Sequence, residues 1–459
     1  MRSWVHSSRR TTRTAAVVAV ASALALTACG SDDGGGGGGN GGGETESTVE
    51  LPDLSGQQLE IAAVWTGPEQ ANFLEAVKEF ESRTGAKVNF VPTGDNVATF
   101  VGQKIEGGSP PDVVLLPQVG VLHEFADRGW IAPVDDAVQE QLDANYGDGW
   151  KDLGAHEGEQ YGVYVKAANK SLIWYNTTAF ENAGVGEAET WDDFITNART
   201  ISDSGTPPVA VAGADGWTLT DWFENIYLSQ AGPEMYDQLA NHEIPWTDDS
   251  VAQALETLGE LFGEESLLAG GSAGALRTDF PTSVTQPFSN PDAPAAAMVY
   301  EGDFVASVIA DSTDAVVGED AQVFPFPAVG EEAPVVSGGD VAVAVAPDGQ
   351  ASEAAQALLA FFASTDAARI WAQQGGFVSP NSQLEFDAYP DEVQRDIAQA
   401  LIEAGDGFRF DLSDQAPAAF GGTTGQGMWQ GLQDFLRNPG DIEGAQEYLE
   451  SQAARAYGD

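Results

Sequence analysis

Residues 58–129 read QLEIAAVWTGPEQANFLEAVKEFESRTGAKVNFVPTGDNVATFVGQKIEGGSPPDVVLLPQVGVLHEFADRG, and they set the fold class. Three short apolar runs predict strands, at residues 58–65, 87–91 and 112–116. Three segments with apolar residues at helical spacing predict helices, one beginning at Gly67-Pro68 and the others at 97–106 and 119–128. The order β-α-β-α-β-α is typical of an open parallel sheet with helices on both faces, so we expect an α/β fold.

The carboxyl ends of these strands are where such a sheet binds its ligands. Trp65 ends the first strand, Asp95 follows the second and Gln118 follows the third. We therefore expect these three side chains at a binding site. Each also has a structural alternative. Trp65 suits a core position over the helix behind it, and Asp95 and Gln118 suit the turns in which they lie.

Further strands and helices follow with a less regular alternation. The pattern predicts strands at residues 161–176, 295–304 and 335–346, and helices at 190–201, 217–230, 249–262, 352–371, 391–404 and 425–435. The roughly 400 residues that follow Leu51 are enough for two domains, each with its own core.

The first 50 residues predict export and anchoring. Four arginines precede an apolar run from Ala15 to Leu26, which is shorter than the roughly 20 apolar residues that span a bilayer. Residues 1–28 therefore fit a signal peptide. Leu26-Thr27-Ala28-Cys29-Gly30 resembles the lipobox of bacterial lipoproteins, which implies a lipid on Cys29. The glycine-rich residues 29–50 then predict a lipidated tether on the extracellular face of the cytoplasmic membrane.

Composition excludes several classes of partner. Nineteen basic residues stand against 71 acidic ones, a formal net charge of −52. Such a surface repels nucleic acid and anionic lipid, so we expect no nucleic-acid partner and a membrane contact only through the lipid. The single cysteine rules out an internal disulfide. With no cysteine pair and no His-Glu-x-x-His motif, we expect no metal and no cofactor.

Five short motifs follow one another in a family-like order: LIWYN at 172–176, TWDDF at 190–194, MVYEGDF at 298–304, GGD at 338–340 and GGFVSP at 375–380. Their order resembles that of the extracellular solute-binding proteins of ABC importers, in the maltose-binding-like group that serves sugars. GWTLTDWFE at 216–224 and RFDLSD at 409–414 are similar to its α-glucoside branch. The resemblance covers nearly all of the chain after the tether.

The resemblance implies a periplasmic-binding-protein-like fold of two α/β lobes, joined by crossing strands around an interlobe cleft. Lobe 1 would hold residues 51–165 and 337–377. Lobe 2 would hold residues 166–336 and 378–459. Binding would close the cleft by a hinge motion, as in periplasmic binding proteins.

A cleft for a neutral sugar needs aromatic rings beside carboxylates, because sugars present apolar C–H faces as well as hydroxyls. The resemblance places such contacts at Asp221 and Trp222 in the helix that begins near 217. Trp217 and Trp222 are five residues apart, so they need not share a helical face, and one of them can be a core residue. Trp429 lies where the family offers a late stacking ring.

Other candidates lie at strand ends and crossings. Glu301, Asp303 and Phe304 end the strand predicted at 295–304, and three such residues exceed what structure alone requires. Asp340 follows two glycines at the return crossing, where a hinge alone would also explain the glycines. Lys166 and Arg409 can bond hydroxyls, and their alternatives are ion pairs, at the hinge for Lys166 and with Asp411 or Asp414 for Arg409.

These observations predict a non-catalytic protein that captures an extracellular carbohydrate, an oligosaccharide or an α-glucoside, and delivers it to an ABC import permease. One alternative is a binding protein of the same fold for a polyamine, a peptide or iron. A surface-anchored glycoside hydrolase is the other, because its two carboxylates carry no fixed sequence spacing.

A serine-hydrolase interpretation is excluded on sequence order. Residues 270–274 read GGSAG and match the G-x-S-x-G pattern, whose serine must follow a strand and precede a helix. We expect residues 267–275 to be a glycine-alanine linker instead. The hydrolase order also places the histidine after the serine, whereas all four histidines of this chain precede Ser272.

Overall fold

The structure is a computed structural model that describes residues 49–330, 332–404 and 407–458. The predicted signal peptide, Cys29 and nearly all of the predicted tether lie outside the described residues. Among the described residues, no helix combines the length and the apolar character needed to cross a bilayer.

The sheet predicted from residues 58–129 is present and its three strands are parallel. It contains β1 (Gln58–Ala63), β2 (Lys87–Pro92) and β3 (Val113–Leu116), with β1 in the middle. The helices α1 (Gly67–Thr84), α2 (Val97–Glu106) and α3 (Val119–Asp127) follow them in turn. This part of the fold class prediction is therefore confirmed.

Helix α1 shows why these elements form where they do. Pro68 lies in its first turn, where a missing N–H costs nothing. Phe73, Val77 and Phe80 repeat at helical spacing and are all buried. Gly85 ends the helix with a φ of 75°, a left-handed conformation that glycine adopts without strain.

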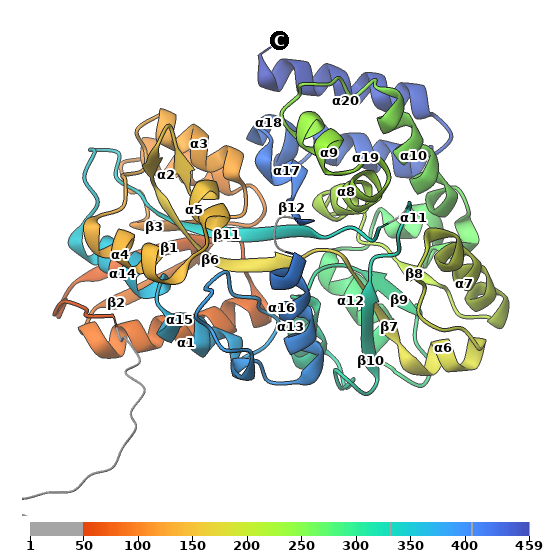
Figure 1. Ribbon diagram of the computed structural model, residues 1–459, viewed down its shortest axis with the longest axis horizontal. Coiled ribbons are helices and arrows are strands. Elements are labelled where there is room, and N and C mark those ends of the chain that lie inside the picture. The colour runs from red at the N-terminus through yellow and green to blue at the C-terminus, as the bar shows by residue number, and fades with distance from the viewer. Residues whose placement is uncertain (1–48, 331, 405–406, 459) are drawn as a thin grey trace, which may run out of the picture. The chain divides into compact units, whose positions relative to one another are not determined.

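Two long strands cross from the first sheet toward the second group of strands (Figure 1). Strand β6 (Gly162–Asn169) pairs antiparallel with β11 (Val336–Ala344), and β11 also pairs with β3 and with β12 (Arg409–Phe410). A Cβ on Gly339 would lie 2.7 Å from the backbone oxygen of Lys166. The glycine is therefore required by the close approach of the two strands, since its φ is not in the left-handed range.

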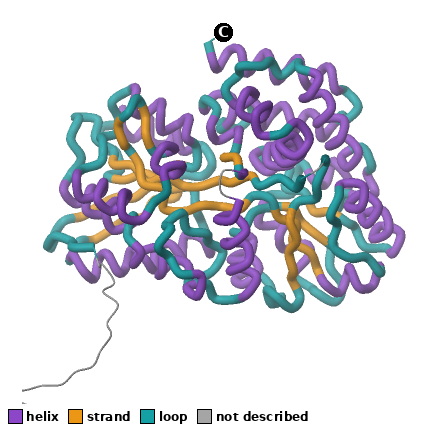
Figure 2. The backbone as a smooth tube through the Cα atoms, in the orientation of Figure 1, coloured by secondary structure: helices purple, strands orange, loops and turns teal. Residues whose placement is uncertain are grey.

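A second sheet has the order β10-β7-β9-β8. Its strands are β7 (Leu172–Asn176), β8 (Val209–Ala210), β9 (Met298–Tyr300) and β10 (Ala321–Pro325). Figure 2 shows the strands of the two sheets in orange, with helices around them.

The single strand expected at 161–176 is wrong, because the chain changes sheets within it. Strand β6 stays in the first sheet, β7 begins the second, and Lys170 and Ser171 form the step between them. The Asn169 side chain accepts a hydrogen bond from the Ser171 N–H at 3.0 Å, and the Lys170 N–H donates to the oxygen of Val336 at 2.8 Å. These bonds satisfy the backbone where no sheet partner does.

Two further predictions were too long. The strand expected at 295–304 is only β9, because Asp303 turns back to bond the oxygen of Asn169 and α13 (Val305–Ser312) begins soon after. The helix expected at 352–371 is two helices, α14 (Glu353–Phe362) and α15 (Thr365–Ala372). Ser364 separates them by capping α15 with its hydroxyl, a residue type that favours helix starts.

The remaining elements complete the described chain. They are α4 (Asp136–Asn145), α5 (Asp148–Leu153), β4 (Ala155–His156), β5 (Glu159–Gln160), α6 (Thr177–Ala183), α7 (Trp191–Ser204), α8 (Trp217–Ala231), α9 (Pro233–Ala240), α10 (Asp249–Phe262), α11 (Gly271–Ala275), α12 (Phe280–Phe288), α16 (Glu392–Ala404), α17 (Leu412–Gln415), α18 (Ala418–Gly421), α19 (Gly427–Arg437) and α20 (Ile442–Tyr457), with 3₁₀ turns at Glu265–Leu267 and Phe386–Ala388.

The buried apolar residues form two clusters. One surrounds the first sheet and includes Phe73, Phe80 and Trp371. The other surrounds α8 and includes Trp222 and Trp246. Helices α13 and α16, which the resemblance assigns to the second lobe, pack into the first cluster. The two halves of the fold are therefore joined by packed helices as well as by the crossing strands.

Replacing Gly339 by alanine tests the close approach of β6 and β11. The new Cβ meets a backbone atom that cannot rotate away, so we expect a loss of about 1–3 kcal/mol in the free energy of unfolding. Gly149→Ala is the matched control, because nothing lies within 4 Å of its added Cβ. We expect it to stay within about 0.5 kcal/mol of wild type. Equal urea midpoints for the two variants would contradict this account of the crossing.

Candidate functional site

Two hollows of similar size lie in the described part of the protein. One, of about 600 Å³, is lined by surface residues of α3 with Asn241, Gln415, Pro417 and Tyr457. The other, of about 520 Å³, lies at the carboxyl ends of β1 and β3 and contains three tryptophans and six carboxylates. Aromatic rings beside a few convergent polar groups are the mark of a solute site. We therefore take the second hollow as the candidate site and call it the pocket.

The three strand-end residues predicted from sequence all line the pocket. Trp65 is also a core residue, with its ring centroid 5.0 Å from Phe73 and 5.1 Å from Trp371. Asp95 and Gln118 line the pocket from the loops after β2 and β3. Trp65 therefore packs in the core and also lines the pocket, so its ring forms the boundary between the two.

Lys166 places a buried ammonium group in the pocket wall. It pairs with Glu69 and lies 4.0 Å from Asp340, and its Nζ is 5.7 Å from the Trp65 ring centroid and 5.1 Å from that of Phe304. Burial lowers the pKa of Lys166, but the neighbouring Glu69 and Asp340 outweigh burial and raise it. Lys166 therefore stays charged, held between two rings and two carboxylates.

Asp340 faces Lys166 from the paired strand β11. Burial raises its pKa to about 6, against the opposing effect of Lys166. Both residues line the pocket, as do Phe304 and Trp429. Seven of the twelve ligand-binding residues predicted from sequence thus meet in one place: Trp65, Asp95, Gln118, Lys166, Phe304, Asp340 and Trp429.

Three aromatic rings lie together on the α8 side of the pocket. The ring centroid of Trp217 is 5.5 Å from Phe280 and 6.1 Å from Phe304. Trp429 comes close because Gly216, with a φ of 80°, has no side chain, and a Cβ there would lie 2.8 Å from the Cβ of Trp429. The indole nitrogen of Trp429 is buried and has no hydrogen-bond partner among the described residues. This side of the pocket offers ring faces for an apolar surface of a solute.

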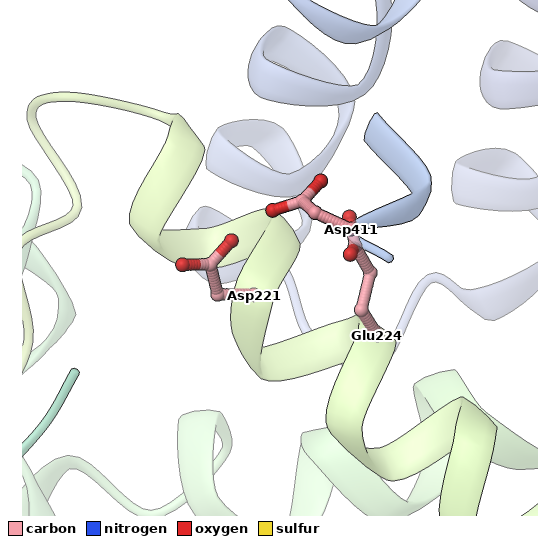
Figure 3. A group of neighbouring side chains, drawn as sticks. All are labelled: Asp221, Glu224 and Asp411. Carbon is pink, nitrogen blue, oxygen red and sulfur yellow. The ribbon is translucent and has the colours of Figure 1, made fainter. Parts of the chain in front are cut away.

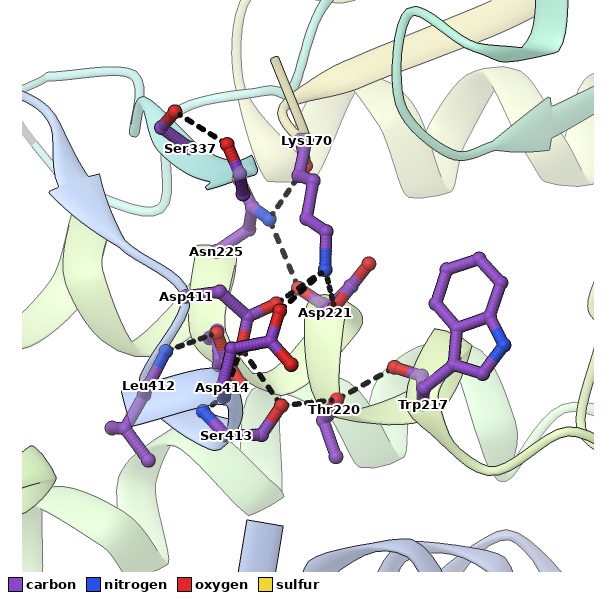
Figure 4. Close-up of polar contacts among 12 residues, drawn as sticks. Lys170, Trp217, Thr220, Asp221, Asn225, Ser337, Asp411, Leu412, Ser413 and Asp414 are labelled. Atoms are coloured by element: carbon purple, nitrogen blue, oxygen red, sulfur yellow. Dashed lines mark hydrogen bonds and ion pairs between the residues drawn. The ribbon is translucent and has the colours of Figure 1, made fainter. Parts of the chain in front are cut away.

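Beside Trp217, Lys170 binds three carboxylates (Figure 4). Its Nζ lies 2.5 Å from Asp411, 3.3 Å from Asp221 and 3.7 Å from Asp414. Burial lowers the pKa of Lys170, and the three carboxylates together raise it well above its ordinary value. Lys170 and Asp414 line the pocket, whereas Asp221 and Asp411 lie behind them.

Glu224 fixes the segment that carries these acids. Its carboxylate accepts hydrogen bonds from the backbone N–H groups of Leu412 at 2.8 Å and Ser413 at 3.0 Å, and from the Tyr236 hydroxyl at 3.1 Å. Leu412 and Ser413 begin α17, so Glu224 acts as a buried acceptor for the free N–H groups of a helix start. This holds Ser413 and Asp414 at the pocket.

Asp221, Glu224 and Asp411 also converge in the way metal ligands do (Figure 3), with one oxygen from each within 4.8 Å of the others. Carboxylate oxygens suit hard cations. Here, however, Lys170 supplies the positive charge to Asp221 and Asp411, and Glu224 is occupied by backbone donors. We therefore read the cluster as a buried ion-pair network and assign no metal to it.

Five predicted site residues do not line the pocket. Trp222 is 1% exposed, with its ring centroid 4.5 Å from Tyr300 in the second core, and Trp217 takes the pocket position instead. Asp221 is buried behind Lys170. Asp221 lies four residues after Trp217, on the same face of α8, and both approach Lys170, whereas Trp222 points into the second core.

Asp303 and Arg409 serve the structure around the pocket, and Glu301 is buried with 1% of its surface exposed. Burial raises the pKa of Glu301 well above its ordinary value. Asp303 accepts the N–H of Asn169 at 2.7 Å and so fixes the step between the two sheets. Arg409 forms an ion pair with Asp237 at 2.8 Å. An ion pair was the alternative expected for Arg409, although with Asp411 or Asp414.

Several pocket residues were missed in the sequence: Glu69, Lys170, Asp215, Trp217, Asp279, Phe280, Ser413 and Asp414. The sequence does carry a helix-start signal at Asp279, the Asp-x-x-Thr pattern. Its side chain caps α12 by accepting the Thr282 N–H at 3.0 Å. Phe280 carried no such signal, because only the fold brings it beside Trp217.

The expected linker at 267–275 contains a short helix, so that prediction is corrected. Helix α11 follows Gly270, whose φ of 76° lets the chain turn into it. The Ser272 hydroxyl donates to Glu265 at 2.6 Å on the surface. Glu265 lies in the 3₁₀ turn that precedes α11, so Ser272 contacts a carboxylate there. The helix therefore follows a 3₁₀ turn and not a strand. The geometry of a nucleophile elbow is therefore not met.

Comparison with known proteins identifies the fold. A family model described as bacterial extracellular solute-binding protein matches residues 65–369. The osmoprotective compounds-binding protein GgtB of Synechocystis sp. is 32% identical over 401 residues, covering 86% of this chain and 91% of that protein. The α-glucosides-binding periplasmic protein AglE of Rhizobium meliloti is 31% identical over 399 residues, covering 84% of each.

A solved structure supports the same architecture. The bacterial solute receptor AcbH superposes with a TM-score of 0.74 and 21% identity, covering 87% of this chain and 99% of that chain. At this sequence identity, the similarity shows the fold alone. The expected α/β periplasmic-binding-protein fold is thereby confirmed.

Lys170→Met tests the buried ion-pair network. Removing the ammonium leaves Asp221, Asp411 and Asp414 without their cation, so we expect a loss of about 3–5 kcal/mol in the free energy of unfolding. Lys78→Met removes an exposed pair with Glu75 and is the matched control, with an expected change below about 0.5 kcal/mol. Chemical denaturation measures both. A similar small change in the two variants would show that the network is not essential.

Asp303→Asn tests the pH dependence of the fold. Burial raises the pKa of Asp303 to about 7 from its ordinary 3.8, so the folded protein holds a proton that the unfolded chain releases. The stability that this group contributes is full below about pH 4 and is lost as the pH rises toward 7. Asparagine has no proton to lose.

The free energy of unfolding of Asp303→Asn, measured relative to wild type, should therefore rise between pH 4 and 8. We expect a growth on the order of 2–4 kcal/mol, because one pKa unit corresponds to about 1.4 kcal/mol. Asp203→Asn, on the exposed end of α7, is the control. Thermal unfolding at each pH measures the difference. A constant difference across this range would rule out the raised pKa.

Proposed function

Because this chain belongs to the bacterial extracellular solute-binding protein family, we propose that its pocket captures a carbohydrate, with an α-glucoside or a related oligosaccharide as the preferred class. Members of the family are the non-catalytic solute-binding components of ABC importers, and this chain is such a component. The permease that receives the solute is the partner that the family implies.

The observation that carries the proposal is the composition of the pocket. Trp65, Trp217 and Trp429 offer rings to the apolar faces of a sugar. Six carboxylates in the same 520 Å³ pocket offer acceptors to its hydroxyls: Glu69, Asp95, Asp215, Asp279, Asp340 and Asp414. This combination suits a compact, hydroxyl-rich solute.

The names of the relatives support the substrate class. AglE is described as binding α-glucosides and GgtB as binding osmoprotective compounds. For this chain, a small α-linked glucoside satisfies both descriptions, because such a sugar can serve as a nutrient or as a compatible solute.

The way of binding follows from the crossing strands. We propose that lobe 1, residues 51–165 and 337–377, and lobe 2, residues 166–336 and 378–459, close around the solute. Lys166 and Asp340 lie on the two crossing strands and line the pocket, so a bound solute touches the hinge itself. Closure is then favoured by the solute's greater affinity for the closed arrangement. A lipid on Cys29 would keep the domain beside its permease.

Titration of the purified protein with trehalose, sucrose, maltose and cellobiose tests the function. Thermal unfolding and tryptophan fluorescence report binding. A solute that binds only the folded state stabilises it by about 2.7 kcal/mol at a hundredfold excess over its dissociation constant. We expect a rise in Tm with at least one α-linked sugar, which chromatography should then recover intact.

Trp217→Leu should weaken that binding about tenfold or more, because it removes a ring face from the pocket. Trp130→Leu is the matched control, since Trp130 is also half-buried but lies outside the pocket. A cleaved sugar would favour a glycoside hydrolase. Binding of putrescine, a peptide or ferric iron in place of every sugar would keep the fold and reject the carbohydrate.

A further inference from the structure

One side of the pocket carries three carboxylates without a cation. Asp95 comes from the loop after β2, Asp215 precedes α8 and Asp279 caps α12, and all three line the pocket. Within the described residues, no lysine, arginine or histidine forms an ion pair with any of them. We call these three residues the acidic wall.

The two lysines of the pocket are bound elsewhere. Lys166 is held by Glu69 and Asp340. Lys170 is held by Asp221, Asp411 and Asp414. Each lysine thus serves carboxylates of its own, and the acidic wall keeps an uncompensated negative charge.

The protein fixes two of these carboxylates in place. Asp215 Oδ2 accepts the N–H of Phe280 at 2.6 Å, and Asp279 Oδ1 accepts the N–H of Thr282 at 3.0 Å. Each has a second oxygen that these bonds leave free. Burial raises the pKa of Asp215 to about 6, and the charges of Asp95 and Asp279 act in the same direction. Asp215 is half-buried, whereas Asp95 and Asp279 are exposed, and like charges held close together favour a positive ligand.

A separate observation also points to a donor on the ligand. Gln118 is 4% exposed, lines the pocket, and its Oε1 has no hydrogen-bond partner in the described protein. Trp217 lies two residues after Asp215 and Phe280 directly follows Asp279, and their ring centroids are 5.5 Å apart. Aromatic faces attract cations. Carboxylates, an unpaired amide oxygen and ring faces together match an ammonium group better than a hydroxyl.

We propose that the acidic wall binds an ammonium group carried by the solute, so that the preferred substrate is an amine-bearing sugar. This inference rests on the proposed carbohydrate function and narrows it. An ammonium group donates three hydrogen bonds and brings the missing charge, whereas a hydroxyl donates one and brings none. The same wall repels uronic acids and sugar phosphates.

The test compares matched sugars by isothermal titration calorimetry. The probes are D-glucose, D-galactose and trehalose, each with its 2-amino and 6-amino derivatives and its uronic acid. We expect at least one amino derivative to bind tenfold or more tightly than its neutral parent in 20 mM NaCl. The advantage should shrink in 500 mM NaCl because salt screens charge, and the uronic acids should bind more weakly than their parents.

Asp215→Asn tests where the preference arises. This variant should reduce the tenfold advantage to less than threefold, whereas Asp203→Asn, exposed on α7, should preserve it. Circular dichroism melting checks that both variants fold.

The outcomes separate this inference from the function beneath it. A neutral sugar that binds as tightly as its amino derivatives overturns the ammonium site and leaves the carbohydrate function standing. An amine preference that survives in Asp215→Asn also overturns the assignment to the acidic wall. Binding of putrescine or spermidine without any sugar rejects both proposals, and binding of none of these probes rejects the ammonium site.

Discussion

The buried ammonium of Lys170 is the interaction on which the rest of the site depends. It lies at the step between the two sheets and draws together Asp221 of α8 with Asp411 and Asp414 of the segment after β12. These three regions are far apart in sequence. Burying so many acids would be prohibitive without a cation among them, because each isolated charge is costly away from water. Lys170 therefore offsets the cost of burying Asp221, Asp411 and Asp414 beside the pocket.

Glu224 is a further buried acid, and backbone N–H groups stabilise it. Its oxygens satisfy the first N–H groups of α17 and the Tyr236 hydroxyl. An acid that faces the start of a helix is favoured by the partial positive charge there. These hydrogen bonds hold Ser413 and Asp414 at the pocket, although the segment that carries them is short and irregular.

The fold was more predictable than the site. The regular spacing of residues 58–129 identified three strands and three helices, because local periodicity reports which face of an element is buried. Periodicity could not show that the chain changes sheets at Lys170, because both halves of 161–176 are equally apolar. Strand ends pointed to Trp65, Asp95 and Gln118, and these residues line the pocket, since a parallel sheet places its carboxyl ends together. Trp217 and Trp222 could not be told apart, because both suit a buried helix, and only the packing of α8 decides which one faces the pocket.

Lys166 has a consequence for any attempt to redesign this protein. It lies on a strand that joins the two halves of the fold, and it also lines the pocket between two aromatic rings. Under the closure proposed above, a change there would alter both the energy of moving the two halves and the energy of binding a solute. A biosensor with a new specificity would therefore be better built from residues such as Phe280, which line the pocket outside the crossing strands.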